Sequence, residues 1–134
     1  MSEQATPQMA KPKHGEFCWN ELGTSNLEIC KPFYAEIFGW HFKENKSPEM
    51  IYNEMSLDGT KQFGGMFQMG KEFGDVPSHW MAYIAVDDVD ASAAKVTELG
   101  GNVCVPPTDI PNTGRFCVVN DPSGATFSLI TLKG

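Results

Sequence analysis

The sequence has few basic residues, and Arg115 is its only arginine. Its 134 residues include 10 Lys and Arg against 17 Asp and Glu, which gives a formal charge of -7. Proteins that bind nucleic acids or anionic membrane surfaces depend on clustered Lys and Arg, so both partners are poor matches for this composition. Acidity of this size is typical of a surface that keeps a protein soluble.

Long apolar runs are also missing. None approaches the roughly 18 to 20 residues that a membrane-spanning helix needs. Residues 1–13 are polar and without periodicity, lacking the apolar stretch of an export signal, and they predict a loose N-terminal arm on a cytoplasmic protein.

The four cysteines, Cys18, Cys30, Cys104 and Cys117, form no CxxC pair. Their wide spacing argues against a zinc ribbon and against a thioredoxin-type redox motif. In a chain without an export signal, scattered cysteines are expected to be reduced and to behave as small hydrophobic residues.

The full sequence, with 41% hydrophobic and 20% charged residues, has the composition of one globular domain, which we expect at residues 14–134. Its periodicity predicts a strand, a helix and three strands, followed by the same order again. The predicted segments are 16–22, 27–38, 40–44, 50–56 and 62–68, then 79–86, 89–99, 102–105, 114–120 and 125–132.

The first helix has clear end signals. Thr24, Ser25 and Asn26 are candidate N-caps, and Gly39 is placed to end the helix. Pro32 leaves two interpretations open: it bends the helix from inside, or the regular helix begins close to it.

An offset of 62 residues aligns the two halves without a gap. Apolar residues fall on apolar residues and a helix-ending glycine falls on a glycine, which indicates a duplicated unit. The matched pairs include Leu22 with Ile84, Asn26 with Asp88, Leu27 with Val89, and Gly39 with Gly101. We therefore predict an α+β fold of two modules, at about 14–70 and 77–132.

Three motifs carry a resemblance to a known family: F-Y-A-E-I-F-G-W at 33–40, Y-I-A-V-D-D-V-D at 83–90 and N-D-P-S-G-A-T-F at 120–127. The chain resembles the vicinal oxygen chelate superfamily of glyoxalases, bleomycin resistance proteins and extradiol dioxygenases. The resemblance implies two βαβββ modules with paired curved sheets around a central cup that holds a small molecule, and pairing of two copies as a homodimer.

The resemblance also implies where a metal would be held. The usual ligand positions fall on Trp19, Met81 and Ser128, and the region 64–67 contains no His, Asp or Glu. Indole has no lone pair to give, a thioether prefers soft metals and a hydroxyl is a weak neutral ligand. We therefore expect no metal cofactor at the usual site, which argues against glyoxalase I chemistry, thiol transfer and ring cleavage.

Glu21 and His79 are the candidate catalytic residues. Alternation along the strands puts Glu21 on the face of Trp19, and His79 on the face of Met81. In the family arrangement Glu21 then lies opposite His79. Such a pair could act as acid and base, could hold a divalent cation away from the usual site, or could simply satisfy two partly buried polar groups.

Aromatic and thioether side chains are the candidate pocket lining, which suits a flat or apolar organic ligand. The candidate ligand-binding residues are Phe17, Trp19, Met66, Met81, Tyr83, Arg115, Phe116 and Ser128. Arg115 has two interpretations, a clamp for a substrate carboxylate or a surface residue.

Three functions remain open on this reasoning. The first is a metal-independent protein that binds a small aromatic or apolar molecule, as in resistance by sequestration. The second is a lyase or isomerase that uses Glu21 and His79. The third is an interaction module whose pocket is vestigial.

Overall fold

The computed structural model describes residues 11–46 and 51–133 and contains two compact units. One unit comprises residues 19–81, and the other comprises the residues up to 18 together with 82–134. The chain boundaries between them fall inside strand β2 (Phe17–Thr24) and inside strand β6 (His79–Ala85). Residues 1–10, most of the predicted N-terminal arm, lie outside the described residues.

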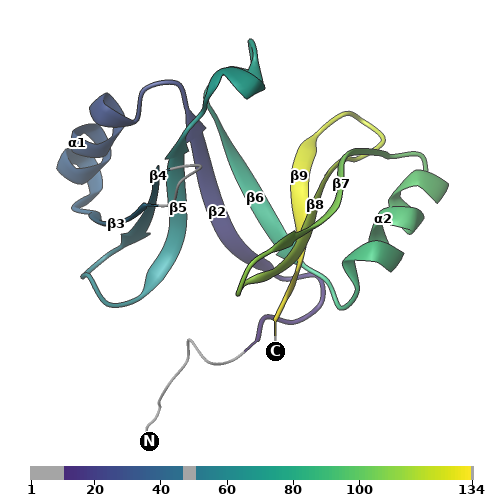
Figure 1. The fold of residues 1–134 in the computed structure, drawn as a ribbon. Coiled ribbons are helices and arrows are strands. Elements are labelled where there is room, and N and C mark those ends of the chain that lie inside the picture. Colours follow the sequence, from purple (N-terminus) through teal and green to yellow (C-terminus); the bar gives the residue numbers. More distant parts are fainter. Residues whose placement is uncertain (1–10, 47–50, 134) are drawn as a thin grey trace, which may run out of the picture. The chain divides into compact units, whose positions relative to one another are not determined.

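The elements follow the predicted order twice, which confirms the α+β fold (Figure 1). After β2 come α1 (Leu27–Phe38), β3 (His41–Lys46), β4 (Ile51–Ser56), β5 (Gln62–Gln68) and the 3-10 turn η2 (Lys71–Phe73). After β6 come α2 (Val89–Glu98), β7 (Asn102–Ile110), β8 (Gly114–Asn120) and β9 (Thr126–Leu132). No helix in the described ranges is both long and apolar enough to cross a membrane.

The 19–81 unit is a four-stranded sheet in the order β3-β4-β5-β2 with α1 on one face. β2 runs parallel to β5, and the other neighbours are antiparallel. The core beneath α1 is formed by Leu22, Leu27, Met55 and Met66, each no more than 4% exposed. This cluster fixes which face of every strand in the unit points toward the helix.

Asn26 is the N-cap of α1, because its side chain accepts a hydrogen bond from the Ile29 N–H. Gly39 ends the helix in the left-handed conformation, at φ 74°, as the sequence predicted. Pro32 lies inside the helix, five residues after its start, so the interpretation in which the regular helix begins close to Pro32 is wrong. Pro32 is exposed, so water can reach the carbonyl group that its missing N–H leaves unpaired.

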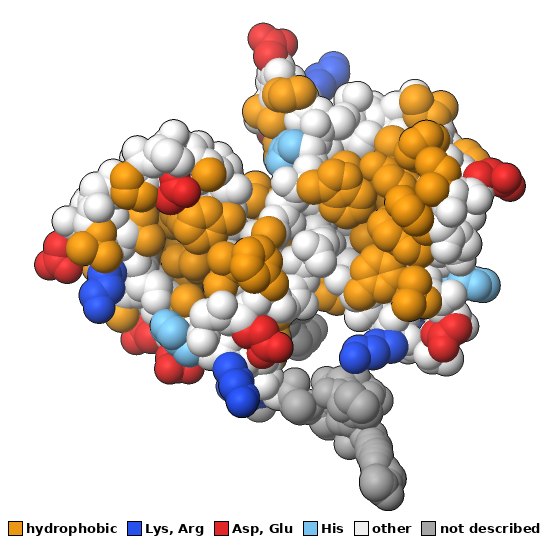
Figure 2. Space-filling model, turned by 180° about the vertical axis from the view of Figure 1, so that it is seen from behind, with side chains coloured by type: hydrophobic (Ala, Val, Ile, Leu, Met, Phe, Trp, Pro, Cys, Tyr) orange, Lys and Arg blue, Asp and Glu red, His pale blue; other side chains and the backbone are white. Residues whose placement is uncertain are grey.

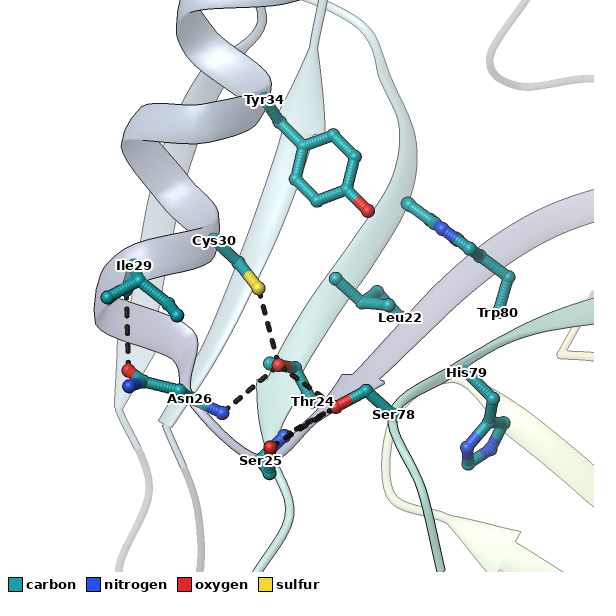
Figure 3. Close-up of a pocket in the computed structure, with 10 residues that line it drawn as sticks. All are labelled: Leu22, Thr24, Ser25, Asn26, Ile29, Cys30, Tyr34, Ser78, His79 and Trp80. Carbon is teal, nitrogen blue, oxygen red and sulfur yellow. Dashed lines mark hydrogen bonds between the residues drawn. The ribbon is translucent and has the colours of Figure 1, made fainter.

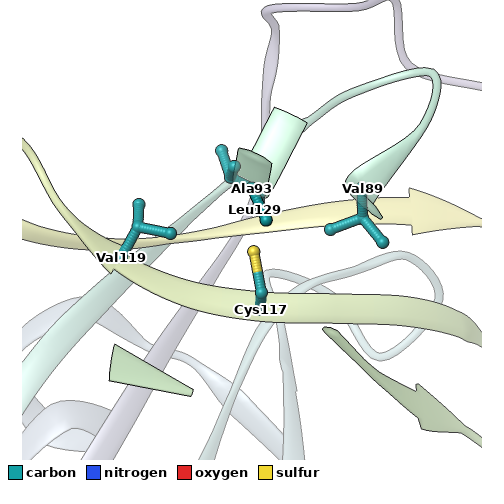
Figure 4. Packing of buried hydrophobic residues seen from close by; sticks show 5 residues of the cluster. All are labelled: Val89, Ala93, Cys117, Val119 and Leu129. Carbon is teal, nitrogen blue, oxygen red and sulfur yellow. The ribbon is translucent and has the colours of Figure 1, made fainter. Parts of the chain in front are cut away.

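The other unit has the strand order β6-β9-β8-β7 with α2 packed on one face (Figure 4). Its core consists of Val89, Ala93, Cys117, Val119 and Leu129.

Strand β7 continues to Ile110, beyond the predicted end at Val105. The added residues include Pro106 and Pro107, and β7 is an edge strand whose pairing with β8 shifts register twice near these prolines. An edge strand tolerates proline because its outer N–H groups need no partner in the sheet.

The duplicated pattern corresponds to matching local structure. Asn26 and Asp88 are both N-caps, and the residues that follow them, Leu27 and Val89, are the first residues of their helices and are both buried. The helix ends differ, because α2 is two residues shorter than α1. The left-handed glycine after α2 is therefore Gly100, at φ 97°, one residue before the predicted match to Gly39.

Candidate functional site

The sheet of the 19–81 unit has one face away from α1, which we call the Glu21 face. Leu22 and Met66 are paired across β2 and β5 and pack toward α1. Because side chains alternate along a strand, Trp19 and Glu21 on β2 project to the opposite face. The register adds Tyr52 and Gly65 to that face, since Glu21 pairs with Gly65 and Tyr52 with Phe67.

A chain of hydrogen bonds crosses the Glu21 face. The indole N–H of Trp19 donates to the Tyr52 hydroxyl over 3.0 Å, and that hydroxyl donates to Glu21 Oε2 over 2.8 Å. Gly65 lies beneath the Tyr52 ring, and a Cβ at this position would collide with the Tyr52 hydroxyl and ring carbons. The absence of a side chain at Gly65 therefore lets Tyr52 reach from β4 across β5 to β2.

This arrangement holds a half-buried carboxylate in a fixed orientation beside aromatic rings. A carboxylate has about four lone-pair positions and can accept several hydrogen bonds at once. Phe67 adds apolar surface to the same face and is 9% exposed. The face therefore combines a hydrogen-bond acceptor with flat apolar walls.

His79 and Met81 lie at the start of β6, within the same unit. The ring of Trp80 contacts Tyr34 of α1, so alternation directs its two neighbours to the other face of the unit. His79 Nδ1 is 2.8 Å from the Pro77 carbonyl oxygen. A carbonyl oxygen only accepts, so this contact assigns the proton to Nδ1.

The predicted Glu21–His79 pair stays a prediction. Glu21 accepts a hydrogen bond from Tyr52, and His79 contacts the carbonyl oxygen of Pro77, and neither contact tests the pair.

A pocket of about 300 Å³ lies beside the first turns of α1, also within the 19–81 unit (Figure 3). Apolar and aromatic side chains form part of its wall, hydroxyl, amide and thiol groups form the rest, and the ring of His79 points away from its centre. Its lining residues are Leu22, Thr24, Ser25, Asn26, Ile29, Cys30, Tyr34, Ser78, His79 and Trp80.

The polar wall of this pocket is internally hydrogen-bonded. Thr24 Oγ1 accepts from the Asn26 N–H over 3.1 Å and lies 3.3 Å from Cys30 Sγ. Ser78 Oγ accepts from the Ser25 N–H over 2.9 Å. Sequence reasoning singled out only His79 here for chemistry, because the residues before α1 were visible only as helix caps.

The other predicted lining residues lie in different environments. Met66 is completely buried in the core beneath α1 and is not on the Glu21 face. Phe17 is 68% exposed. In the other unit Tyr83 is 8% exposed, its ring centroid lies 6.4 Å from that of Phe116, and it pairs in register with Ser128.

Arg115 is engaged by two carboxylates on the surface. Its Nε lies 2.9 Å from Asp90 Oδ2, and its Nη1 lies 3.1 Å from Asp109 Oδ1. The hydrogen bonds from Arg115 lower the pKa of Asp90. This geometry fits the surface interpretation of Arg115 better than a clamp for a substrate.

Two thiols are shielded by burial. Burial raises the pKa of Cys18, and the negative charge of Glu16 adds to this effect. Burial is likewise the main cause of the raised pKa of Cys117. Neither environment activates a thiol as a nucleophile, which requires a lowered pKa.

The residues at the family's metal positions do not fit a hard divalent cation. The only polar atom of the Trp19 side chain is a donor already bonded to Tyr52, and Met81 offers a soft thioether. Ser128 is fully buried, and its hydroxyl has no hydrogen-bond partner in the described ranges. Residues 11–46 and 51–133 contain no cluster of three or more His, Cys, Asp or Glu that could hold a metal ion.

Comparisons with known proteins agree with the fold. The family model described as "Glyoxalase/Bleomycin resistance protein/Dioxygenase superfamily" matches residues 19–129. CFP32 of Mycobacterium tuberculosis, whose name assigns it provisionally to the glyoxylases, is 39% identical over 117 residues, which are 87% of this chain and 44% of that protein. DnrV of Streptomyces peucetius, named as an anthracycline biosynthesis protein, is 29% identical over 127 residues, 86% of this chain and 46% of DnrV.

A solved structure shows the same architecture. Streptomyces coelicolor methylmalonyl-CoA epimerase, in complex with 2-nitronate-propionyl-CoA, superposes with a TM-score of 0.65 at 17% identity, covering 91% of this chain and all of that one. At this identity the likeness shows the fold alone. The chain spans less than half the length of the two curated relatives.

Proposed function

Because the chain belongs to the glyoxalase/bleomycin resistance protein/dioxygenase superfamily, we propose that it binds a small organic molecule with an aromatic or apolar body on the Glu21 face. The proposal includes no metal at the family's usual positions. The observation that carries it is the chain from Trp19 through Tyr52 to Glu21, which fixes an acceptor carboxylate next to aromatic surface.

The charge of Glu21 selects the polar group of the ligand. A half-buried carboxylate attracts a hydroxyl, amine or cationic donor and repels an anion. The Streptomyces relative is named for anthracycline biosynthesis, and anthracyclines carry flat, hydroxylated aromatic rings of this chemical type. The ligand class we propose is therefore an aromatic compound that carries at least one hydrogen-bond donor and no negative charge.

Two naphthalene probes test this class by isothermal titration. We expect 2-naphthol to bind saturably and 2-naphthalenesulfonate, of similar shape but anionic, to bind at least tenfold more weakly. Glu21→Gln should reduce this discrimination, and Tyr52→Phe should weaken 2-naphthol binding. Glu28→Gln removes an equivalent charge from the exposed surface of α1 and should leave both affinities unchanged.

The proposal fails if 2-naphthol shows no saturable binding, or if it binds equally well to the wild type and to both Glu21 face variants. The first result would favour the interaction module.

A lyase or isomerase that uses Glu21 and His79 is the second candidate. It is favoured by the Tyr52 hydroxyl, which orients Glu21, and by the assignment of a proton to His79 Nδ1, because the neutral ring then carries its lone pair on Nε2, where it can act as a base. The solved relative acts on a methylmalonyl thioester, as its name states. The test is the uptake of deuterium by methylmalonyl-CoA when the protein is incubated with it in D₂O. Uptake by the wild type that is lost in Glu21→Gln and in His79→Ala, at unchanged melting temperature, would support this candidate. Unchanged uptake in both variants would exclude Glu21 and His79 as the catalytic pair.

A further inference from the structure

One face of α1 is apolar and exposed to solvent. Ile29, Phe33 and Ile37 follow one another at intervals of four residues and therefore form a single stripe along the helix. They are 65%, 56% and 55% exposed. An amphipathic surface helix normally turns its apolar stripe inward, so α1 carries a second apolar stripe in addition to the one that contacts the core.

Aromatic rings extend this stripe sideways. Phe38, which is 55% exposed, stacks on Trp40 with ring centroids 4.8 Å apart and on Tyr34 at 6.3 Å. Trp80 is 44% exposed and meets the Tyr34 ring edge-on at 5.6 Å. We call Ile29, Phe33, Ile37, Phe38 and Trp80 the α1 surface. In Figure 2 hydrophobic side chains gather on the lobe that contains α1, on the right of that view.

The α1 surface is large enough to be an interface. Five side chains of this size, each about half exposed, present on the order of 500 Å² of apolar area. Stable dimers bury about 800 Å² on each partner, with a polar rim around an apolar centre. The apolar area of the α1 surface is therefore more than half of the area that each partner buries in a stable dimer.

This surface is also ordered before any partner binds. Tyr34 and Trp40, on which Phe38 stacks, pack against the core cluster of the 19–81 unit. A surface whose aromatic rings are already fixed loses little conformational entropy on association.

We propose that the α1 surface binds the same surface of a second copy of this chain, with the two α1 helices antiparallel across a twofold axis at Phe33. The stripe Ile29-Phe33-Ile37 reads the same in both directions about Phe33. Antiparallel docking therefore places aliphatic against aliphatic at both ends and aromatic against aromatic at the centre, which is the self-complementarity that a twofold interface requires.

The charges of α1 are compatible with this arrangement. Across an axis at Phe33, Glu28 faces position 38, Lys31 faces position 35 and Glu36 faces position 30, and these positions hold Phe, Ala and Cys. No charged residue of the helix meets a like charge. The two helix dipoles also run in opposite directions, which is favourable for neighbouring helices.

Sedimentation velocity of the 134-residue chain between 1 and 100 µM tests the interface. We expect a concentration-dependent dimer for the wild type and a monomer for Phe33→Glu, which brings two carboxylates together at the axis. Leu57→Glu is the matched control, since Leu57 is 69% exposed in the same unit and lies outside the α1 surface. The control should dimerise like the wild type, and circular dichroism should show that all three chains are folded.

Cross-linking tests the orientation. In a Cys104→Ser background, oxidation of Phe33→Cys should give a covalent dimer, because each Phe33 meets its own counterpart, whereas Ile29→Cys should cross-link poorly. A monomeric wild type at 100 µM, a dimeric Phe33→Glu or preferential cross-linking of Ile29→Cys would overturn the proposal. The α1 surface and the Glu21 face lie on opposite faces of the sheet, so 2-naphthol binding by Phe33→Glu reports on the proposed function separately.

Discussion

Asn53 is a buried amide whose replacement should stabilise the protein. It lies on β4 opposite Met66, on the face that packs toward α1, and is 1% exposed. Neither its Oδ1 nor its Nδ2 has a hydrogen-bond partner within residues 11–46 and 51–133. A buried amide group without partners costs about 1–3 kcal/mol of folding free energy.

The substitution Asn53→Leu keeps the branching at Cγ and replaces both polar atoms with methyl groups. It should recover the cost of burying the unpaired amide. The extra volume of leucine should offset up to about 1 kcal/mol of that gain, a small penalty because the neighbouring Met55 and Met66 side chains adapt readily. We expect a net gain of about 1–2 kcal/mol, which for a chain of this length corresponds to a rise in Tm of about 3–8 °C.

Thr24→Val is the matched comparison, because it also replaces a buried polar group by an apolar one of the same shape. Thr24 is 2% exposed, but its hydroxyl accepts from the Asn26 N–H and contacts Cys30 and Ser78. Removing it leaves a helix-start N–H unpaired and should cost about 1–2 kcal/mol.

Urea unfolding and calorimetry of both variants give the two changes in free energy. The reasoning would be refuted if Asn53→Leu were destabilised and Thr24→Val unaffected. The change in stability would then not depend on whether the replaced polar group has hydrogen-bond partners.

Three further predictions concern the other unit. Asp88→Ala should destabilise the protein by about 1 kcal/mol in urea unfolding, because the Asp88 carboxylate caps the N–H groups of two residues at the start of α2; no change would contradict the cap. Arg115→Gln should lower stability at pH 7, and in unfolding curves the difference should begin to shrink as the pH falls below about 4 and vanish only below the lowered pKa of Asp90, because the stabilisation is lost as that carboxylate is protonated in the folded state; a deficit that does not shrink as the pH falls towards about 2 would argue against the ion pair. Iodoacetamide at pH 8 followed by peptide mass spectrometry should modify the exposed Cys104 in the native protein and Cys117 only after unfolding, because Cys117 is fully buried; early modification of Cys117 would show that the β8 core opens readily.

The fold was predictable because its signals are local and occur twice. Helix caps, helix-ending glycines and apolar periodicity can each be recognised within a short segment. The 62-residue offset then allowed the elements predicted in one module to be checked against those predicted in the other. The end of β7 was not predictable in this way. The predicted strand stops at Val105, just before two prolines, and the position of β7 at the edge of its sheet is what lets the strand continue through them.

The candidate site was predictable only in part. Alternation along β2 is enough to group Trp19 with Glu21, because strand residues two apart share a face. Tyr52 was missed, since its contact with Glu21 depends on the register of β4, β5 and β2 and on the space above Gly65. The sequence of β4 has no pattern that distinguishes a tyrosine whose side chain extends over β5 to β2 from a tyrosine whose side chain lies over β4 itself.

Ser128 is one of three residues that stand where the family usually has a metal ligand and that do not suit a hard metal ion. The resemblance places a carboxylate ligand at this position, where the side chain is 0% exposed. A carboxylate buried there would need a cation to offset its desolvation, because an unpaired buried charge costs several kcal/mol. Trp19 and Met81 supply no ligand suited to a hard cation. A small neutral hydroxyl is the less costly occupant of such a position, so each of the three residues, taken by itself, is a poor ligand for a hard cation.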